Sequence, residues 1–314
     1  MKEIKAVRIH NYEGPQGLRV ENVSLPQPQS GEVLIRVHAA GVNPIDWKIR
    51  AGHMRSRMAS HLPFTLGVDL SGVIEAIGPD VADLKIGDEV YGQAAVFNGG
   101  SGSFAEAAVT PASGVAAKPQ KLDYPEAGAL PLAGVSALQA LTEHLRISPG
   151  QKVLIHGGAG GIGSIAIQIA KHLGAYVATT VSPRNIDFSK RLGADEVIDY
   201  NKENFADVLN GFDAVLDTVG GDTYVRSFKV LKKGGRIVSL LESPREDLMK
   251  EFGVEASSIF TQATTERLMK LAELVDQGAV RVEIEKTFPL DLAAAALDYV
   301  EKQSPRGKVA LIVS

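Results

Sequence analysis

Apolar and polar residues alternate in short runs through the N-terminal part of the chain. From Lys5 to about residue 110 these runs are separated by glycine, proline and aspartate. Clear examples are Glu32–His38 (EVLIRVH), Val68–Ile77, which Gly72 interrupts, and Gly87–Tyr91. Short strands with regular turn signals between them predict an irregular antiparallel or barrel-like β domain.

The pattern changes at Tyr124. An Ala- and Leu-rich helical stretch over Pro125–Leu145 ends before Pro149–Gly150, and strand and helix patterns then alternate. The predicted strands are Val153–His156, Tyr176–Thr180, Glu196–Tyr200, Phe212–Asp217 and Arg236–Leu240, with helices between them that include Asn185–Leu192 and a helix near Tyr224–Leu231. This alternation predicts right-handed βαβ crossovers and an α/β fold with a doubly wound parallel sheet.

The C-terminal part changes pattern again. A helix over Glu266–Gln277, an alternating strand (RVEIEKTFPL), an Ala-rich helix and a closing strand (GKVALIV) follow one another. We therefore expect residues 1–123 and 260–314 to form one β-rich domain, with the α/β domain, residues 124–259, inserted between its two parts.

The segment KVLIHGGAGGIG, residues 152–163, joins the first predicted strand of the α/β domain to a helix. Gly158, Gly160 and Gly163 match G-x-G-x-x-G between a strand and a helix, which is the context of a dinucleotide-binding motif. One glycine permits a tight turn, one lets the backbone approach a pyrophosphate, and one lets the helix pack closely on the strand. The helix N-terminus offers N–H groups and a positive dipole end to the phosphates. The residues of this turn predicted to bind the cofactor are Gly158, Ala159, Gly160, Gly161, Ile162 and Gly163.

The composition narrows the classes of function. The net charge is −4 and the lysines and arginines are scattered, so no surface for nucleic acid is indicated. No apolar run reaches the roughly 18 residues that indicate a membrane span. The chain has no cysteine, which excludes disulfides, thiolate chemistry and cysteine-ligated zinc. The first residues lack the long apolar core of a signal peptide, so a cytoplasmic location is expected.

Several segments, in order over nearly the whole chain, carry a family resemblance. They are AGVNPIDWKIRAG (40–52), PFTLGVDLSGVIEAIG (63–78), KIGDEVYG (85–92), LPLAGVSALQAL (130–141), VLIHGGAGGIG (153–163), LGADEVIDY (192–200) and RGKVALIV (306–313). Together they resemble the medium-chain dehydrogenase/reductase superfamily, in its zinc-free quinone oxidoreductase and enone (alkenal) reductase branch. The resemblance implies a Rossmann domain inserted in a GroES-like catalytic domain.

The resemblance also bears on zinc. Zinc-dependent relatives carry a ligand Cys where this chain has Asn43, and Gly-His-Glu where it has Gly67-Val68-Asp69. A catalytic zinc needs about three protein ligands, and Asp69 alone does not supply them. His53 and His61 lie nearby in the sequence, but their spacing matches no metal motif. No metal is expected.

The end of the second strand of the α/β domain distinguishes the two nicotinamide cofactors. An NAD site usually has an acid there, which bonds the ribose 2′-hydroxyl. This chain has Ser182, Arg184 and Asn185 instead. An arginine and hydroxyl groups would bind a 2′-phosphate, so NADPH is the predicted cofactor, and Tyr200 lies near the same phosphate by resemblance. The alternative is that Arg184 is only a solvated charge at the start of a helix.

Hydride transfer without a metal suits an electrophilic carbon, such as the β-carbon of an α,β-unsaturated carbonyl or a quinone. The reaction needs hydrogen-bond donors for the carbonyl oxygen and a proton for the α-carbon. The segment that holds Asn43, Asp46 and Lys48 faces the nicotinamide in the family. Asn43 is predicted to donate an amide hydrogen bond, and Lys48 to stabilise an enolate or deliver a proton with Asp46 as its orienting partner. The alternatives are that Asp46 only holds a loop and that Lys48 points to solvent. Tyr91 is a further candidate donor, with a buried packing role as its alternative.

Three more residues are predicted to bind the cofactor by resemblance alone. They are Ser136, close to the nicotinamide, Leu240, whose backbone region binds the carboxamide, and Lys308. The family also implies a homodimer formed through the edge strand of the α/β sheet, and a cleft between the domains as the place of the substrate. The aromatic side chains of Trp47, Phe64 and Phe97 are candidates for an apolar wall of that cleft, with core packing as the alternative.

The predicted function is reduction of quinones or enones by NADPH. Two alternatives stay open at this point: an NAD(P)-dependent dehydrogenase of simple alcohols, and a nucleotide-binding protein that has lost turnover. The choice among quinone, alkenal and cyclic enone depends on loops near 53–64, 93–103 and 243–260, which have no informative pattern.

Overall fold

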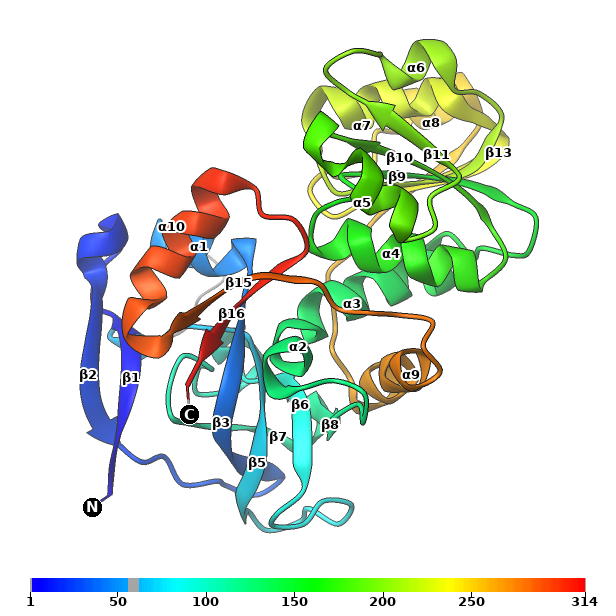
Figure 1. Cartoon of the computed structure of the whole chain (residues 1–314). Coiled ribbons are helices and arrows are strands. Elements are labelled where there is room, and N and C mark those ends of the chain that lie inside the picture. The colour runs from blue at the N-terminus through cyan, green and yellow to red at the C-terminus, as the bar shows by residue number, and fades with distance from the viewer. Residues whose placement is uncertain (1, 56–61, 314) are drawn as a thin grey trace. The chain divides into compact units, whose positions relative to one another are not determined.

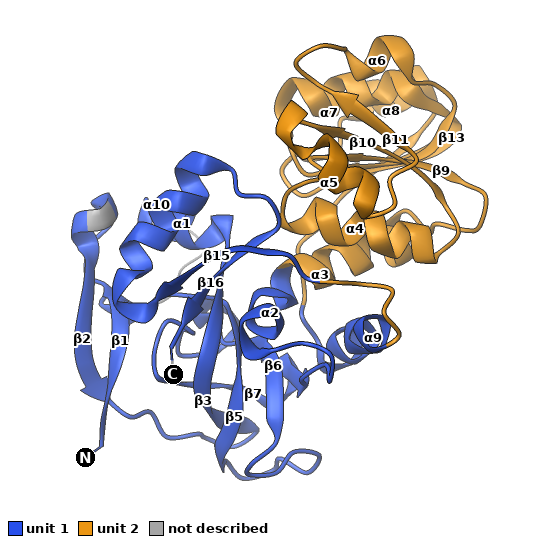
Figure 2. Ribbon diagram, viewed as in Figure 1, with its two compact units in different colours: residues 1–132, 263–276, 282–314 blue, residues 133–262, 277–281 orange. Residues whose placement is uncertain are grey.

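A computed structural model of the chain describes residues 2–55 and 62–313 (Figure 1). It divides into two compact units, coloured separately in Figure 2. Unit 1 comprises residues 1–132, 263–276 and 282–314, and unit 2 comprises residues 133–262 and 277–281. Both ends of the chain thus belong to one unit, and the other unit is built from the sequence between them.

Unit 1 is rich in β structure. The larger sheet of its described residues has seven strands, in the spatial order β15 (Ile284–Pro289), β16 (Lys308–Ile312), β3 (Glu32–Val42), β5 (Asp69–Ile77), β6 (Glu89–Gln93) and β8 (Val115–Ala117), with β7 (Ala107–Pro111) paired to β3. The smaller sheet has the order β2 (Leu18–Ser24), β1 (Glu3–Ile9) and β4 (Phe64–Thr65). All pairings in both sheets are antiparallel except that of β15 with β16.

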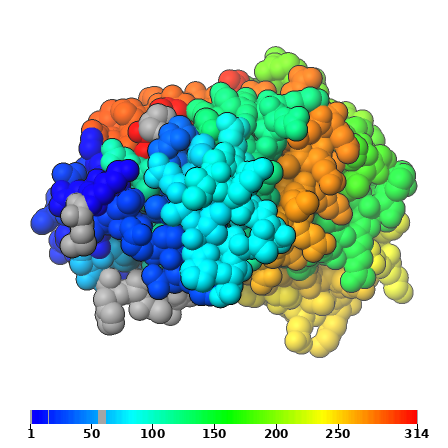
Figure 3. Space-filling model, turned by 90° about the horizontal axis from the view of Figure 1, so that it is seen from below, coloured from blue at the N-terminus to red at the C-terminus, as the bar shows by residue number. Residues whose placement is uncertain are grey.

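The helices of unit 1 cover these sheets. They are α1 (Pro44–Arg50), α2 (Tyr124–Ala129), α9 (Thr265–Asp276) and α10 (Ala293–Gln303), with short 3₁₀ turns at Gly14–Gly17, Val96–Asn98, Ala112–Gly114 and Leu290–Leu292. α9 packs against β8, and Figure 3 shows it in orange beside the cyan residues of the same unit. The alternation in β3 explains one core: Val33, Ile35 and Val37 point inward, where they pack with Leu70 and Ile74 of β5.

α2 belongs to unit 1, although the sequence analysis placed residues 124–129 in the α/β domain. It packs against β3, β5 and β16. The approach is close because a Cβ at Gly41 of β3 would lie 2.6 Å from the Gly128 carbonyl oxygen. Glycine at both positions therefore lets α2 lie directly on the sheet.

Unit 2 contains a parallel sheet of six strands among its described residues. Their order is β11 (Glu196–Asp199), β10 (Tyr176–Val181), β9 (Lys152–His156), β12 (Phe212–Asp217), β13 (Leu231–Ser239) and β14 (Glu255–Ser258). In chain order this is 3-2-1-4-5-6, the arrangement of a Rossmann fold. The predicted doubly wound parallel sheet is confirmed.

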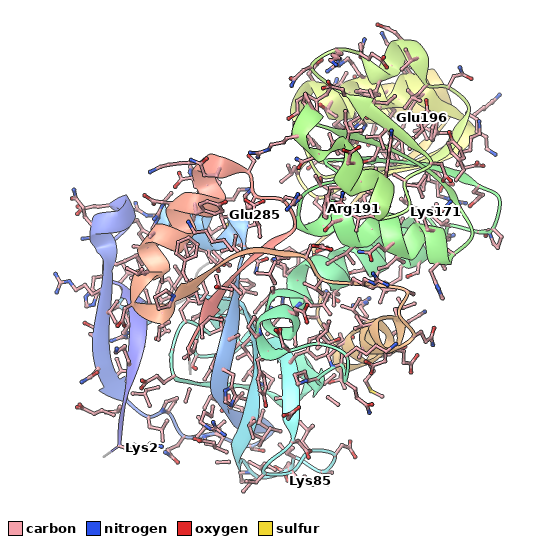
Figure 4. The ribbon with its side chains drawn as sticks, viewed as in Figure 1. Lys2, Lys85, Lys171, Arg191, Glu196 and Glu285 are labelled. Carbon is pink, nitrogen blue, oxygen red and sulfur yellow. The ribbon has the colours of Figure 1, made fainter. Side chains whose placement is uncertain are left out.

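The helices of unit 2 connect these strands. They are α4 (Gly161–His172), α5 (Ile186–Arg191), α6 (Phe205–Val208), α7 (Gly221–Ser227) and α8 (Glu246–Phe252), with 3₁₀ turns at Pro183–Asn185 and Phe228–Val230. Lys171, labelled in Figure 4, lies near the end of α4, and its ammonium is 2.8 Å from the Asp195 carboxylate at the start of β11. This pair ties a helix to the sheet that it covers.

The helix predicted over 125–145 is three segments: α2, α3 (Pro131–Gln139) and a π-helical turn at Ala140–His144. Pro131 lacks an N–H and so starts a new helix. In the described part of the chain, no helix is both long enough and apolar enough to cross a bilayer.

Candidate cofactor and active site

The glycine turn after β9 has the geometry that its sequence predicts. Gly157 has a positive φ of 69°, which favours glycine. A Cβ at Gly158 would lie 2.0 Å from the Thr179 hydroxyl oxygen, and one at Gly163 would lie 2.2 Å from the Gly157 carbonyl oxygen. Gly160 is different, because a Cβ there would meet nothing closer than 3.4 Å. Three glycines therefore close the turn onto the sheet and helix, and the fourth leaves its outer face open.

This open face lies at the start of α4. Gly160 is the N-cap residue in extended conformation, and the helix runs for 12 residues from Gly161. The first N–H groups of a helix have no partner within the helix and carry its positive dipole end. Ala159 is buried beneath the turn, whereas Gly161 and Ile162 are partly exposed. The arrangement is suited to a pyrophosphate.

The carboxyl end of β10 carries the residues predicted to select the cofactor. Ser182 and Asn185 lie together, with Asn185 Nδ2 donating to Ser182 Oγ at 3.1 Å, and Arg184 is exposed between them in the 3₁₀ turn. The neighbouring strand ends in Asp199, but this carboxylate is buried and accepts the Asn201 N–H at 3.1 Å. Tyr200, the next residue, is exposed.

The carboxyl ends of β12 and β13 are joined by a buried hydrogen-bond network. Asp217 accepts the N–H groups of Val219 (3.0 Å) and Gly220 (2.9 Å) and the Ser239 hydroxyl (2.7 Å). Ser239 Oγ accepts in turn the N–H groups that follow it, from Leu241 at 3.1 Å and Glu242 at 3.0 Å. The network fixes the loop that contains Leu240. The sequence analysis did not single out Asp217 or Ser239, although each is a polar residue at the end of a buried strand.

Exposed apolar side chains form a row along the same edge of the sheet. Asp217, Ser239 and Ser258 are register partners across β12, β13 and β14. Two residues after each of them stand Val219, Leu241 and Phe260, which are 50%, 51% and 53% exposed. Ser136 reaches this edge as well, with its hydroxyl 2.6 Å from that of Thr261. We call Val219, Leu241 and Phe260 the apolar row.

In unit 1, four neighbouring strands bring polar side chains together at one end of the sheet. Val309 of β16 pairs with Val42 of β3, so Lys308 lies opposite Asn43. Asp69 of β5 pairs with both Gly41 of β3 and Gln93 of β6. The Lys308 ammonium donates to Asn43 Oδ1, Asn43 Nδ2 donates to Asp69 Oδ2 at 2.9 Å, and Gln93 Nε2 donates to Asp69 Oδ1 at 3.0 Å. We call Lys308, Asn43, Asp69 and Gln93 the polar row.

The charges of the polar row are out of contact with water. Burial raises the pKa of Asp69 to about 6. The nearby Lys308 ammonium and the hydrogen bonds from Asn43, the Leu132 amide and Gln93 act in the opposite direction and lower this pKa. Burial also lowers the pKa of Lys308, which Asp69 and Asp46 partly offset. Lys308 is only 4% exposed, and its predicted contact with the cofactor stays a prediction.

Asp46 and Lys48 do not form the predicted pair. Asp46 Oδ2 accepts the Asn43 N–H at 2.7 Å, which caps α1, and its other oxygen has no hydrogen-bond partner. Positions two apart on a helix face different directions, so Lys48 points elsewhere. Its ammonium lies 5.8 Å from the centre of the Trp47 ring. Burial raises the pKa of Asp46 to about 8.

Tyr91 is fully buried, and its hydroxyl donates to the Leu268 carbonyl oxygen at 2.5 Å. Burial raises the pKa of this hydroxyl well above its ordinary value. The side chain packs in the interior of unit 1, which agrees with the packing role and not with a donor to substrate. His53 packs edge-on against Trp47, at 6.1 Å between ring centres. His61 lies outside the described residues.

Comparisons with known proteins agree with this architecture. Residues 29–120 match the alcohol dehydrogenase GroES-like domain model, and residues 192–311 match the zinc-binding dehydrogenase model. The chain is 37% identical to 2-methylene-furan-3-one reductase of Solanum lycopersicum, over 98% of this chain and 79% of that one. It is 35% identical to the chloroplastic NADPH-dependent alkenal/one oxidoreductase of Arabidopsis thaliana, again over 98% and 79%.

Solved structures agree too. A quinone oxidoreductase from Coxiella burnetii has a TM-score of 0.92 at 36% identity, with both chains covered completely. A mycobacterial protein solved with NADPH has a TM-score of 0.88 at 30% identity, with 99% of this chain and 100% of that one covered. The chain belongs to the medium-chain dehydrogenase/reductase superfamily. Within it, the chain is an oxidoreductase of the quinone oxidoreductase and alkenal/one reductase branch, whose members depend on NAD(P)H.

The family includes zinc-dependent enzymes. The side chains of the polar row show whether this chain could bind zinc. Zinc sites use three or four His, Cys or carboxylate ligands. By the resemblance, Asn43 and Val68 stand where zinc-dependent relatives carry ligands, and the Asp69 carboxylate accepts three N–H donors and lies near an ammonium. Among residues 2–55 and 62–313, no group of three or more His, Cys, Asp or Glu is placed to hold a metal ion. The residues present do not fit zinc.

Proposed function

We propose that this protein is an NADPH-dependent reductase that adds a hydride to the C=C bond of α,β-unsaturated carbonyl compounds, or to quinones, without a metal ion. The observation that carries the choice of cofactor is the end of β10, where residues 182–185 include a hydroxyl, an exposed guanidinium and an amide but no acid. These groups would hold a 2′-phosphate by charge-assisted hydrogen bonds, and a carboxylate would repel it.

The rest of the cofactor has a matching surface on unit 2. The open face of Gly160 and the first N–H groups of α4 would hold the pyrophosphate. The exposed Tyr200 ring and the ordered loop at Leu240 would contact the two ends of the dinucleotide. Bound NADPH supplies the hydride, and reduction of the C=C bond also consumes one proton.

The chain's own part in the reaction is to orient the acceptor and to stabilise charge. Lys48 Nζ is our candidate donor to the carbonyl oxygen, because it is partly exposed and, among the described residues, forms no ion pair. An ammonium there would stabilise the negative charge that develops on this oxygen and would hold a proton for the product.

The proposal is tested by following oxidation of NADPH and of NADH with a panel of acceptors: an alkenal, a cyclic enone, a quinone and a saturated ketone. We expect turnover of at least one activated acceptor with NADPH and none of the saturated ketone. NADPH binding without reduction of any acceptor would contradict the proposed activity. Preferential reduction of the saturated ketone would favour an alcohol dehydrogenase.

The cofactor assignment predicts a selective effect of Arg184→Ala. Loss of the guanidinium should weaken NADPH binding about tenfold or more and change NADH binding little, because a charge-assisted bond to phosphate is worth about 1.5–3 kcal/mol. Arg191→Ala is the matched control, since Arg191 is an exposed arginine at the other end of α5 (Figure 4). Dissociation constants from fluorescence titration decide the outcome. Equal losses for the two cofactors would remove the 2′-phosphate assignment.

A further inference from the structure

The polar row contains a buried lysine that the proposed mechanism does not use. Lys308 comes from the last strand of the chain, 265 residues from the asparagine that its ammonium contacts. A buried ammonium carries a large desolvation cost unless it is paired. Here the Asp69 carboxylate supplies the opposite charge, and Asp46 adds to it only where the pH is high enough to ionise it.

The contacts determine the orientation of the Asn43 amide. An amide has one accepting oxygen and one nitrogen that donates two hydrogens. The Lys308 ammonium occupies the oxygen, and Asp69 takes one hydrogen of the nitrogen at 2.9 Å. Turning the amide over would place its NH₂ group against an ammonium and its oxygen against a carboxylate. The amide is therefore held in one orientation, with one N–H left to donate.

Asn43 stands where this orientation affects a reaction site. It is the N-cap residue of α1, and its own backbone N–H is held by Asp46. Lys48, the candidate donor to the acceptor, lies on the same helix. A displaced cap would change the start of α1 and with it the position of Lys48 and the remaining Asn43 N–H.

We propose that Lys308 is a positioning residue of the active site: its buried ammonium orients the Asn43 amide and compensates the charge of Asp69, in the place where zinc-dependent relatives carry their ligand set. This inference rests on the proposed function for its catalytic consequence, but the network itself does not. In this role Lys308 acts through Asn43, the residue that its ammonium contacts.

The ionisable groups around the row are few. In the described part of the chain, those that act on Asp69 and Asp46 are Lys308 and, for Asp46, also Asp69. Most other ionisable groups on the elements packed there have partners of their own: Arg50 with Asp298 and Glu301, Arg36 with Glu75, Glu89 with Tyr124, Tyr91 with the Leu268 carbonyl, Glu126 with the Asp123 N–H, Glu285 with Tyr299, and Lys286 over the Phe288 ring. Lys48, also on α1, is partly exposed, and its ammonium lies 5.8 Å from the centre of the Trp47 ring. A pH effect of Lys308 is therefore expected through Asp69 near pH 6 and through Asp46 near pH 8.

The sign of that effect follows from the charges. Asp69 must be ionised to hold the Asn43 amide, so wild-type kcat should fall as the pH drops below about 6, the pKa of Asp69. Removal of the ammonium takes away an opposite charge and raises the pKa of this carboxyl further. The acid limb of the pH profile should then move to higher pH.

The first test compares Lys308→Met, Lys308→Arg and the control Lys118→Met. Lys118 is a second, largely buried lysine of unit 1, bound to the Leu122 carbonyl at 2.8 Å and paired with Glu89 instead of a residue of the row. We expect Lys308→Met to lower kcat about tenfold or more with little change in the KM for NADPH. The acid limb of the kcat–pH profile of Lys308→Met should move to higher pH by about one unit or more. Lys308→Arg should have the acid limb of the wild type. Lys118→Met should keep the wild-type profile. An unmoved limb in Lys308→Met would overturn the proposal.

A second measurement does not depend on turnover. Trp47 is the single tryptophan of the chain and lies on α1 directly after Asp46. Its fluorescence should titrate with pH in the wild type, and the midpoint should rise in Lys308→Met but not in Lys118→Met. If the wild type reduces no acceptor yet this midpoint moves, the proposed function fails and the network stands. An identical midpoint in both proteins contradicts the network.

A third variant covers the case in which Lys308→Met does not fold. Asp69→Asn/Lys308→Met removes both charges, and a neutral pair is far less costly to bury than one uncompensated charge. We expect this double variant to fold, to have a lowered kcat, and to show no acid limb near pH 6. A double variant with wild-type kcat and the wild-type limb would refute a positioning role for Lys308.

Discussion

Asp46 is a completely buried carboxyl with a single hydrogen bond, from the Asn43 N–H at 2.7 Å. Its neighbour in the sequence, Lys48, is partly exposed. Residues two positions apart on one short helix thus have opposite surroundings. Burial decides the chemistry of each: Asp46 caps a helix in the core, and Lys48 can meet a small molecule. The same distinction separates the buried Tyr91 hydroxyl from the exposed Tyr200 ring.

The burial of Asp46 predicts how stability depends on pH. Its pKa is raised from 3.8 to about 8, so between these values the folded state binds more protons than the unfolded state. Asp46 therefore makes its full contribution to the free energy of unfolding below about pH 4, and this contribution is lost as the pH rises towards 8. Asp46→Asn cannot ionise and should gain stability relative to the wild type by about 4 kcal/mol between pH 5 and 8.

Urea unfolding at both pH values measures this difference. Asp83→Asn is the control, because Asp83 is an exposed carboxyl of the same unit. A gain that is the same at pH 5 and pH 8 would contradict the raised pKa.

Among the elements, the turn from β9 to α4 is tightly constrained. Its glycines have separate physical roles: Gly163 allows the helix to touch the turn, and Gly160 leaves an open face. The two roles should respond differently to one added methyl group.

We predict that alanine at Gly163 mainly lowers stability, whereas alanine at Gly160 mainly weakens NADPH binding. Gly163→Ala forces a Cβ to within 2.2 Å of a backbone carbonyl oxygen and 2.7 Å of the Gly158 Cα, so the protein should lose about 2 kcal/mol of stability. Gly160→Ala meets nothing closer than 3.4 Å and should lose less than about 1 kcal/mol, the cost of a weaker N-cap. It should still bind NADPH about tenfold more weakly, because its methyl group occupies the face proposed for the pyrophosphate. Thermal unfolding and NADPH titration measure the two effects. Unimpaired NADPH binding by Gly160→Ala would show that the cofactor approaches elsewhere.

In the whole molecule, β11 and β14 are the two edge strands of the parallel sheet. Among the described residues, each of them pairs with one neighbouring strand only. β14 is one edge strand, with β13 as its neighbour. The Ile259 N–H donates to the Ser239 carbonyl oxygen of β13 at 3.1 Å. Because successive N–H groups of a strand point to opposite sides, the Ala256 N–H points away from β13, to the free edge of the sheet. We propose that β14 pairs with its copy in a second chain to form a homodimer.

This dimer is testable by mass. Light scattering should give twice the 33.3 kDa of one chain for the wild type and for Ala256→Ser. Ala256→Pro removes the N–H at the edge and should give a folded monomer, since proline is tolerated on an edge strand. A dimer that persists in Ala256→Pro, or a monomeric wild type, would exclude pairing through β14.

Local patterns predicted much of this molecule. The parallel sheet and the glycine turn follow from apolar periodicity and from the glycines themselves, which act within a few residues of one another. The segment after β13 was missed, because β14 (EASS) is a short edge strand with little apolar character and α8 (Glu246–Phe252) buries none of its residues fully. The domain boundary was placed before α2, because only the packing of α2 on β3 and β5 assigns it to unit 1.

Residue types alone predict the glycine turn after β9, the lack of an acid among residues 182–185 and, by the resemblance, a site without zinc ligands at Asn43 and Val68. Each of these is a matter of residue type at a position that neighbouring residues define. Only the tertiary structure decided the polar row. Lys308 and Asn43 are separated by 265 positions, and antiparallel pairing of β16 with β3 sets them opposite each other. Burial then couples their charges, because an ammonium and a carboxylate removed from water must compensate each other.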